Sequence, residues 1–166
     1  AKEWLSLLED SFLLRLVHPH HTNPTKRMVK SPKLYFLDAG LAAWLGGWRD
    51  VDSLRLGPMA GPLFETHVFG EILRRFRHRV REVEISFWRT RDGDEIDFLV
   101  EAGGRTFPIE VKIGLPDPRD LPPLQKLGAP NWQPGTVISL AGGTEGAALS
   151  SKWRLAPARD LGFLPV

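Results

Sequence analysis

The chain contains no cysteine, and none of its apolar runs approaches the length of a membrane span. Without cysteine, disulfides and thiolate metal ligands are excluded. A helix that crosses a bilayer needs about 20 apolar residues, so we expect no membrane partner. The opening stretch, AKEWLSLLED, lacks the features of a signal peptide. Together these absences predict a cytoplasmic protein.

The composition is that of a globular protein. Of the 166 residues, 42% are apolar and 25% are charged. These values allow a buried core, and the length suits one domain, or one domain and a fragment of another. The chain does not begin with methionine, so we expect it to be a piece of a longer protein.

Basic residues are unevenly distributed although the net charge is only +2. Arginine outnumbers lysine 15 to 7, and five arginines fall in RRFRHRVR, residues 74–81. The planar guanidinium group binds two phosphate oxygens at once, which favours contact with nucleic acid. A solvated helix face also explains such a run, and charge alone leaves both explanations open.

Seven residues are candidate contacts to nucleic acid. The candidates are Lys26, Arg27, Lys30, Arg74, Arg75, Arg77 and Trp88. Trp88 would lie opposite Asp97 if Asp92-Gly93 is a two-residue hairpin turn. There it would either stack on a nucleobase or pack at the rim of the core.

Hydrophobic periodicity and turn residues predict the elements. Residues 2–17 are expected to form a helix followed by a strand, residues 33–47 a strand and a short helix, and residues 48–62 a connector. After Leu63 the predicted order is helix, three-stranded meander, short helix, two strands and a last helical turn. The turns of the meander fall at Asp92-Gly93 and Gly103-Gly104.

The second hairpin of the meander places charged residues together. If Gly103-Gly104 is a two-residue turn, Ala102 pairs with Arg105, and Asp97 then lies opposite Glu110. Opposed residues share a face, with Cβ atoms about 5 Å apart. Lys112 lies two residues further along, on the same face, because strand side chains alternate.

Two opposed carboxylates repel each other, and a divalent cation between them would reverse the sign of the interaction. Mg²⁺ is commonly held by one or two carboxylates together with waters and substrate phosphate. Lys112 beside such an ion would act on the attacking water or stabilise charge on the phosphate. The simpler explanation is an exposed strand pair in which Lys112 neutralises both acids, and spacing alone leaves it open.

Asp97, twelve intervening residues and then EVK (residues 110–112) resemble the PD-(D/E)XK nuclease signature. That resemblance implies a restriction-endonuclease-like α/β fold, with a helix, a three-stranded meander that bears the motif, a helix and further strands. Ile96 stands where the name of the motif has proline.

The same resemblance implies the roles of the site residues. Asp97 and Glu110 would hold Mg²⁺ or Mn²⁺, and Lys112 would act on the attacking water. The family often carries a further glutamate on the first helix, where Glu65 has the matching place and Glu71 is a weaker candidate.

A closer likeness covers most of the chain. The segments SPKLYFLDAGLAAWL, GPLFETHVFGEI, WRTRDGDEIDFLV and FPIEVK are similar to a C-terminal domain of unknown function found in prokaryotic AAA-type ATPases. The likeness implies a partial winged-helix segment and linker in residues 1–56 and a nuclease-like domain in residues 57–166. It also implies an ATPase domain that precedes this region in the full-length protein.

No G-x-x-x-x-G-K-[ST] phosphate-binding loop occurs, so we expect no ATP site in this chain. The leading hypothesis is Mg²⁺-dependent hydrolysis of phosphodiester bonds in DNA. The second is a non-catalytic module that binds DNA or protein and regulates the attached ATPase. The third is a structural oligomerisation domain. A pocket filled by side chains would favour the second or third hypothesis.

Overall fold

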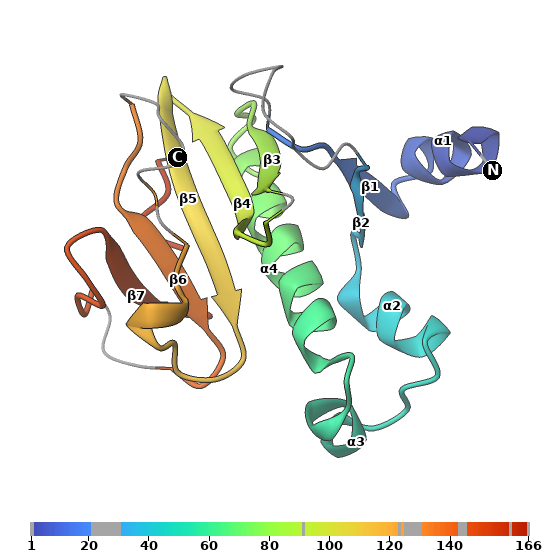
Figure 1. The fold of residues 1–166 in the computed structure, drawn as a ribbon. Coiled ribbons are helices and arrows are strands. Elements are labelled where there is room, and N and C mark those ends of the chain that lie inside the picture. The colour runs from blue at the N-terminus through green and yellow to red at the C-terminus, as the bar shows by residue number, and fades with distance from the viewer. Residues whose placement is uncertain are drawn as a thin grey trace.

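The computed structural model describes residues 2–20, 31–90, 92–122, 124, 131–142, 146–159 and 161–165, which form a mixed α/β fold (Figure 1). The elements are α1 (Lys2–Asp10), β1 (Leu14–Val17), β2 (Lys33–Phe36), α2 (Ala39–Leu45), α3 (Val51–Leu56), α4 (Ala60–Arg77), β3 (Glu84–Arg89), β4 (Glu95–Ala102), β5 (Arg105–Lys112), the 3₁₀ turn η1 (Pro118–Asp120), β6 (Gly135–Ser139) and β7 (Trp153–Pro157).

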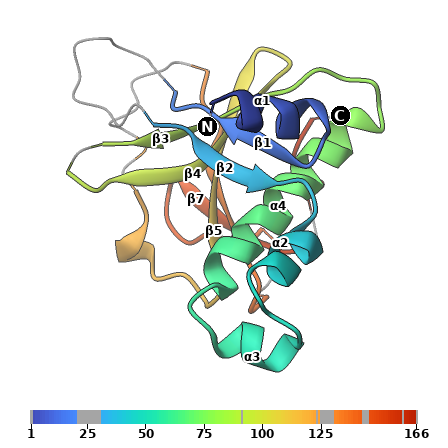
Figure 2. The ribbon, with the colours of Figure 1, turned by 90° about the vertical axis from the view of Figure 1, so that its right-hand side faces the viewer.

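A five-stranded sheet with the order β3-β4-β5-β6-β7 is the framework of the fold. Strands β3, β4 and β5 form an antiparallel meander, while β5, β6 and β7 are parallel. The predicted meander and the two later strands are therefore confirmed. Strands β1 and β2 form a separate antiparallel pair that contacts β3 and α4, and Figure 2 shows this pair lying over them.

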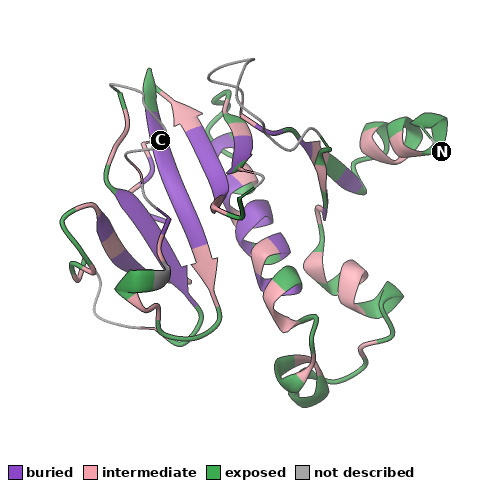
Figure 3. Cartoon of the chain, viewed as in Figure 1, coloured by how far each residue is buried: buried purple, intermediate pink, exposed green. Residues whose placement is uncertain are grey.

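The main core lies between α4 and one face of the sheet. Apolar residues recur along α4 at helical spacing and are buried: Phe64, Val68, Phe69, Ile72 and Phe76. They pack with Phe98, Ile109 and Ile138 of the sheet. Figure 3 shows buried residues concentrated on these strands and on α4, whereas α1, α2 and α3 bury none.

The other face of the sheet is also covered. Trp88, Ile96 and Leu99 form a buried cluster against Leu124 and Trp132. Strand β4 therefore has apolar packing on both faces, which explains its nearly continuous burial.

The predicted register of the second hairpin is confirmed over most of its length. Gly103 and Gly104 both have positive φ, 58° and 72°, as a two-residue turn of this kind requires. Pairing runs from Ala102–Arg105 to Phe98–Ile109. The ladder ends there, one residue short of Asp97.

The predicted register of the first hairpin is wrong near the turn. Trp88 pairs with Ile96, whereas Ser86 pairs with Leu99, so Phe87 alone opposes two residues of β4, Asp97 and Phe98. This is a β-bulge, which interrupts the alternation of side chains. It lets Ile96 join Leu99 in one cluster while Phe98 joins the core beside α4.

Two local predictions are also wrong, and a third lies partly outside the described residues. Helix α3 lies within residues 48–62, where a connector was expected. Asp50 stabilises the start of this helix, because its side chain accepts a hydrogen bond from the Ser53 amide at 2.7 Å. The helix expected after β5 is only η1 in its described part, where Pro116, Pro118 and Pro122 interrupt the sequence. The described residues after β7 form turns and no helix.

Among the described helices, none combines the length and the apolar character needed to cross a bilayer.

Substitution of Phe69 tests the placement of this core. The Phe69 side chain is 1% exposed and stacks on Tyr35 with ring centroids 4.8 Å apart. Phe69→Ala should lower the free energy of unfolding by about 3–5 kcal/mol, since it leaves a cavity where α4 meets the sheet. Urea denaturation measures the change. Arg77→Ala, at an exposed position on the same helix, should change stability by no more than about 0.5 kcal/mol. Equal effects of the two substitutions would contradict this placement of the core.

Candidate active site

Charged side chains from four elements gather at one end of the sheet. Because β4 and β5 are antiparallel, the start of β4 and the end of β5 lie at the same end (Figure 1). The carboxylates there are Glu65 from α4, Glu95 and Asp97 from β4, and Glu110 from β5. The cations are Lys33 from β2 and Lys112 from β5. We call this set the acid cluster.

Glu110 is the most buried acid of the cluster, at 5% exposure. Its Oε1 accepts a hydrogen bond from Lys112 Nζ at 2.7 Å. Its Oε2 is buried and has no hydrogen-bond partner among the described residues. Burial raises the pKa of Glu110, and the hydrogen bond and charge of Lys112 only partly oppose that rise.

Asp97 occupies the bulge of β4. Its Oδ2 accepts a hydrogen bond from the Val111 amide at 2.9 Å, and its Oδ1 lies 3.5 Å from Lys33 Nζ. Burial, and then the negative charges of Glu110 and Glu65, raise the pKa of Asp97 to about 8. A carboxyl group in this position binds a proton at neutral pH unless another cation neutralises the cluster.

Lys33 is the cation at the centre of the other acids. Its Nζ lies 2.6 Å from Glu95 Oε1 and 3.0 Å from Glu65 Oε1, besides the Asp97 contact. Burial lowers the pKa of Lys33, but the charges of Glu65 and Asp97 and the hydrogen bonds to Glu95 and Glu65 outweigh burial and raise it. Lys33 is therefore a fixed positive charge.

Tyr35 supports the same acids from β2. Its hydroxyl donates a hydrogen bond to Glu65 Oε1. Burial and the charge of Glu65 raise the pKa of Tyr35, so the side chain remains a neutral phenol that donates its proton to that bond. Together, Lys33 and Tyr35 fix the Glu65 carboxylate from one side.

The structure brings Asp97, Glu110, Lys112 and Glu65 to the same end of the sheet. Glu71, the weaker candidate, pairs instead with Arg74 on the outside of α4. Sequence reasoning missed Lys33, Tyr35 and Glu95 as members of the cluster. The one local signal was alternation in KLYF, which puts a lysine and a tyrosine on the same face of an otherwise apolar strand.

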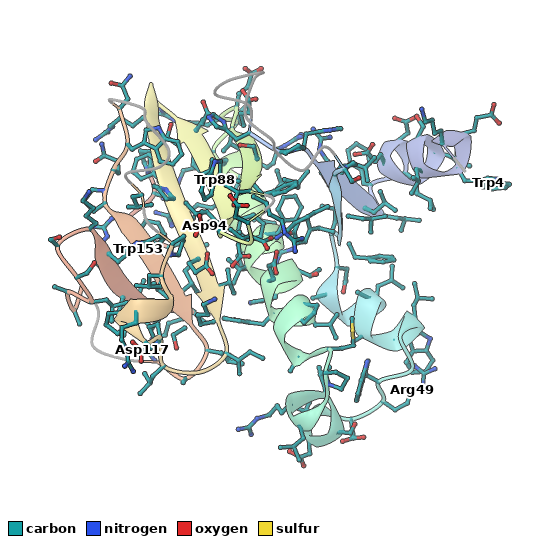
Figure 4. The ribbon with its side chains drawn as sticks, viewed as in Figure 1. Trp4, Arg49, Trp88, Asp94, Asp117 and Trp153 are labelled. Atoms are coloured by element: carbon teal, nitrogen blue, oxygen red, sulfur yellow. The ribbon has the colours of Figure 1, made fainter. Side chains whose placement is uncertain are left out.

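The candidate contacts to nucleic acid do not form one surface. Trp88 is 4% exposed and packs on Ile96 and Leu99, so the suggestion that it stacks on a nucleobase is wrong, and core packing is what the structure shows. Figure 4 labels it among the side chains of the meander. Arg74 and Arg75 border one hollow beside α4, whereas Arg77 borders others. Lys26, Arg27 and Lys30 lie outside the described residues.

A divalent cation would suit the Glu110 side of the cluster, because the buried Oε2 atom has no hydrogen-bond partner among the described residues. The negative charge of Glu110 also helps to raise the pKa of Asp97, so the two acids interact. Within the described residues, however, no three His, Asp or Glu side chains converge as a preformed metal site requires. A cation there would rely on two carboxylates completed by waters and substrate oxygens.

The site thus consists of two buried acids and a lysine at one end of a mixed sheet. Comparison with known proteins identifies the family of the chain. Residues 60–161 match the model of a domain of unknown function, DUF4143, and the chain belongs to this family. Residues 1–52 match a second domain of unknown function, DUF8612. No solved structure matches the chain.

Two curated relatives are similar to the chain. An uncharacterized protein of Mycobacterium bovis and one of Mycobacterium tuberculosis are each 32% identical to it over 112 residues. The match covers 68% of this chain and 24% of each relative. The chain thus spans about a quarter of the length of the relatives it matches.

Asp97→Asn should change the pH dependence of stability. A carboxyl group whose pKa is raised on folding binds its proton more tightly in the folded state. Wild-type stability should therefore fall as the pH rises from about 4 to about 8. The variant lacks this loss, so relative to wild type it should gain on the order of 1–3 kcal/mol between pH 4 and pH 8. Urea denaturation at a series of pH values, without divalent metal, gives the difference.

Asp10→Asn provides the control for this experiment. Asp10 ends α1 at an exposed position, and the substitution makes the same change in charge away from the acid cluster. The stability of this variant should run parallel to that of wild type. If Asp97→Asn also runs parallel to wild type, Asp97 is not the buried, strained carboxyl group described above.

Proposed function

We propose that the chain carries a Mg²⁺-dependent nuclease site that hydrolyses phosphodiester bonds in DNA. The observation that carries this proposal is the buried, unpartnered Oε2 of Glu110, next to Lys112 and at the same end of the sheet as Asp97. A plain salt bridge between Lys112 and Glu110 leaves that oxygen unsatisfied. A divalent cation would satisfy it and would also neutralise Asp97.

The order of the elements supports a restriction-endonuclease-like domain. Helix α4 precedes an antiparallel meander, and β6 returns parallel to the last strand of the meander. The motif residues fall on β4 and β5, where the resemblance requires them. The departure is the connection from β5 to β6, which in its described part contains η1 and no α-helix.

Each residue of the cluster then has a chemical role. Asp97 and Glu110 would hold the cation, which when bound polarises the phosphate and lowers the pKa of a water. Lys112 would donate hydrogen bonds to the attacking water or to a phosphate oxygen. Glu65, whose Oε1 accepts a hydrogen bond from Tyr35, would assist as a further acid beside Asp97. Hydrolysis adds a water oxygen to phosphorus, breaks one phosphorus–ester oxygen bond and leaves a hydroxyl on the departing strand.

A basic hollow on the outside of α4 supports a nucleic-acid substrate. Arg74, Arg75, Arg79 and Arg159 border it together with His67 and His78. Such groups contact the phosphate backbone and give binding that weakens as salt is added. Arg74 also pairs with Glu71, so only part of its charge is available to a substrate.

The parent protein is the remaining part of the proposal. The curated relatives are about four times longer than the matched region, which leaves room for the ATPase domain that the family likeness implies. We propose that the nuclease site lies next to that ATPase domain in a cytoplasmic protein and acts on DNA that the ATPase binds. Oligomerisation of the ATPase would bring several nuclease sites together.

One observation favours a non-catalytic module instead. The ammonium group of Lys33 fills the space between Glu65, Glu95 and Asp97, as a side-chain plug would in a domain that regulates the ATPase. Cleavage assays separate the two functions.

Wild-type protein should cleave DNA when Mg²⁺ or Mn²⁺ is added, and single-stranded, double-stranded and branched substrates should be compared. Lys112→Gln should reduce the cleavage rate by about 10²-fold or more, because it removes a charged donor at the reacting phosphate, yet it should retain Mn²⁺ binding. Glu110→Gln should lose both cleavage and Mn²⁺ binding. Lys2→Gln, at an exposed position on α1, is the matched control and should cleave like wild type.

A different outcome would select the non-catalytic function. If millimolar Mg²⁺ and Mn²⁺ leave both the DNA and the melting temperature of the wild-type protein unchanged, the site is no nuclease. Binding of DNA or of the ATPase domain without cleavage would then describe the module.

A further inference from the structure

The acid cluster already contains a cation, and that cation comes from the N-terminal part of the chain. Lys33 Nζ lies within 3.5 Å of carboxylate oxygens of Glu65, Glu95 and Asp97. The three acids belong to the region matched by DUF4143, whereas Lys33 belongs to the region matched by DUF8612. One ammonium group thus joins the two regions at the candidate site.

Both oxygens of Asp97 are engaged in this arrangement. The Val111 amide donates to Oδ2, and Lys33 lies against Oδ1. Glu65 Oε1 accepts from both Lys33 and Tyr35. A divalent cation on Oδ1 of Asp97 would lie beside the Lys33 ammonium group, and two cations held side by side on the same carboxylate repel each other.

We propose that Lys33 is the resident cation of the acid cluster and that a divalent metal binds only by displacing it. This inference rests on the proposed function for the identity of the incoming metal. Residues 1–52 then control the metal occupancy of a site whose acids lie in residues 60–161. Weak metal binding by the resting protein follows directly.

The structure allows the Lys33 side chain to move away from the three acids while the backbone of β2 stays in place. Tyr35 is buried, stacks on Phe69 and donates to Glu65, so it anchors the strand. Lys33 begins β2, and its side chain is 22% exposed, which gives the ammonium group a path to water. A lysine carries its charge on four flexible methylene groups, so the charge moves without a change in the backbone.

Titration with Mn²⁺ by calorimetry tests the proposal. Lys33→Gln should bind Mn²⁺ at least about tenfold more tightly than wild type, because the competing charge is gone. Glu110→Gln added to the Lys33→Gln variant should remove this gain. Melting curves should show the metal-free Lys33→Gln variant below wild type and restored by Mn²⁺, since its three acids lack their cation until the metal binds.

Arg89→Gln is the matched control. Arg89 Nε lies 3.3 Å from Glu95 Oε2, so the substitution also removes one positive charge beside the cluster. The Arg89 side chain is 49% exposed and forms an ion pair with Glu95, so a metal on Asp97 need not displace it. Its Mn²⁺ affinity should stay within about twofold of wild type, because an exposed charge contributes little.

A second measurement uses the wild-type protein and keeps the proposal testable if Lys33→Gln folds poorly. Acetic anhydride should modify Lys33 slowly in metal-free protein, because its Nζ lies among three carboxylates and its side chain is only 22% exposed. Saturating Mn²⁺ should release the side chain and speed its modification, measured by mass spectrometry of the peptide that contains Lys33. Lys2, exposed on α1, should react equally in both conditions.

The results separate this proposal from the proposed function. If Lys33→Gln binds Mn²⁺ no more tightly than wild type, or if neither protein binds it, or if saturating Mn²⁺ leaves Lys33 protected, the displacement proposal is overturned. Cleavage by a wild type whose Lys33 never leaves would support the nuclease and refute the displacement. Tighter binding by Lys33→Gln without any cleavage would support the displacement and refute the nuclease.

Discussion

The acid cluster holds more negative charge than the groups around it neutralise, and this imbalance constrains the site and its surroundings. Asp97 and Glu110 are buried, and burial opposes the ionisation of both. Lys112 satisfies one oxygen of Glu110 and leaves the other without a partner among the described residues. A proton on Asp97, the ammonium group of Lys33 or a divalent metal each relieves the imbalance. We interpret the site as a competition among these three.

The ion pairs of Lys33 link the N-terminal hairpin to the sheet. Tyr35 joins the core through Phe69 and joins the cluster through Glu65, so the strand that presents Lys33 is packed and aligned by the same contacts. The bulge in β4 turns Asp97 toward that strand while Phe98 stays in the core. Strand β2 therefore contributes both to the apolar core and to the charged site. The site needs residues from both β2 and β4.

Local sequence signals predicted most of the sheet and part of the site. The Gly103-Gly104 turn admits one register, which is why the second hairpin was predicted correctly. The bulge was not predictable, because Ile96, Asp97 and Phe98 also suit regular alternation, and what displaces them is the packing of Trp88 on the far face. Lys33 was not predicted as a site residue, since a contact between residues so distant in sequence leaves no local pattern. Helix α3 was missed because it is only six residues long and begins at a cap.

A crystal structure of the whole chain grown with Mn²⁺, with the metal located by its anomalous scattering, tests the central claim most directly. The account predicts one Mn²⁺ peak at about 2.0–2.3 Å from carboxylate oxygens of Asp97 and Glu110, with Oε2 of Glu110 among the ligands. It also predicts that Lys33 Nζ has left Oδ1 of Asp97, while Tyr35 still contacts Glu65. A Lys33 that remains among the three acids, with no Mn²⁺ peak at the cluster at saturating concentration, would contradict the account.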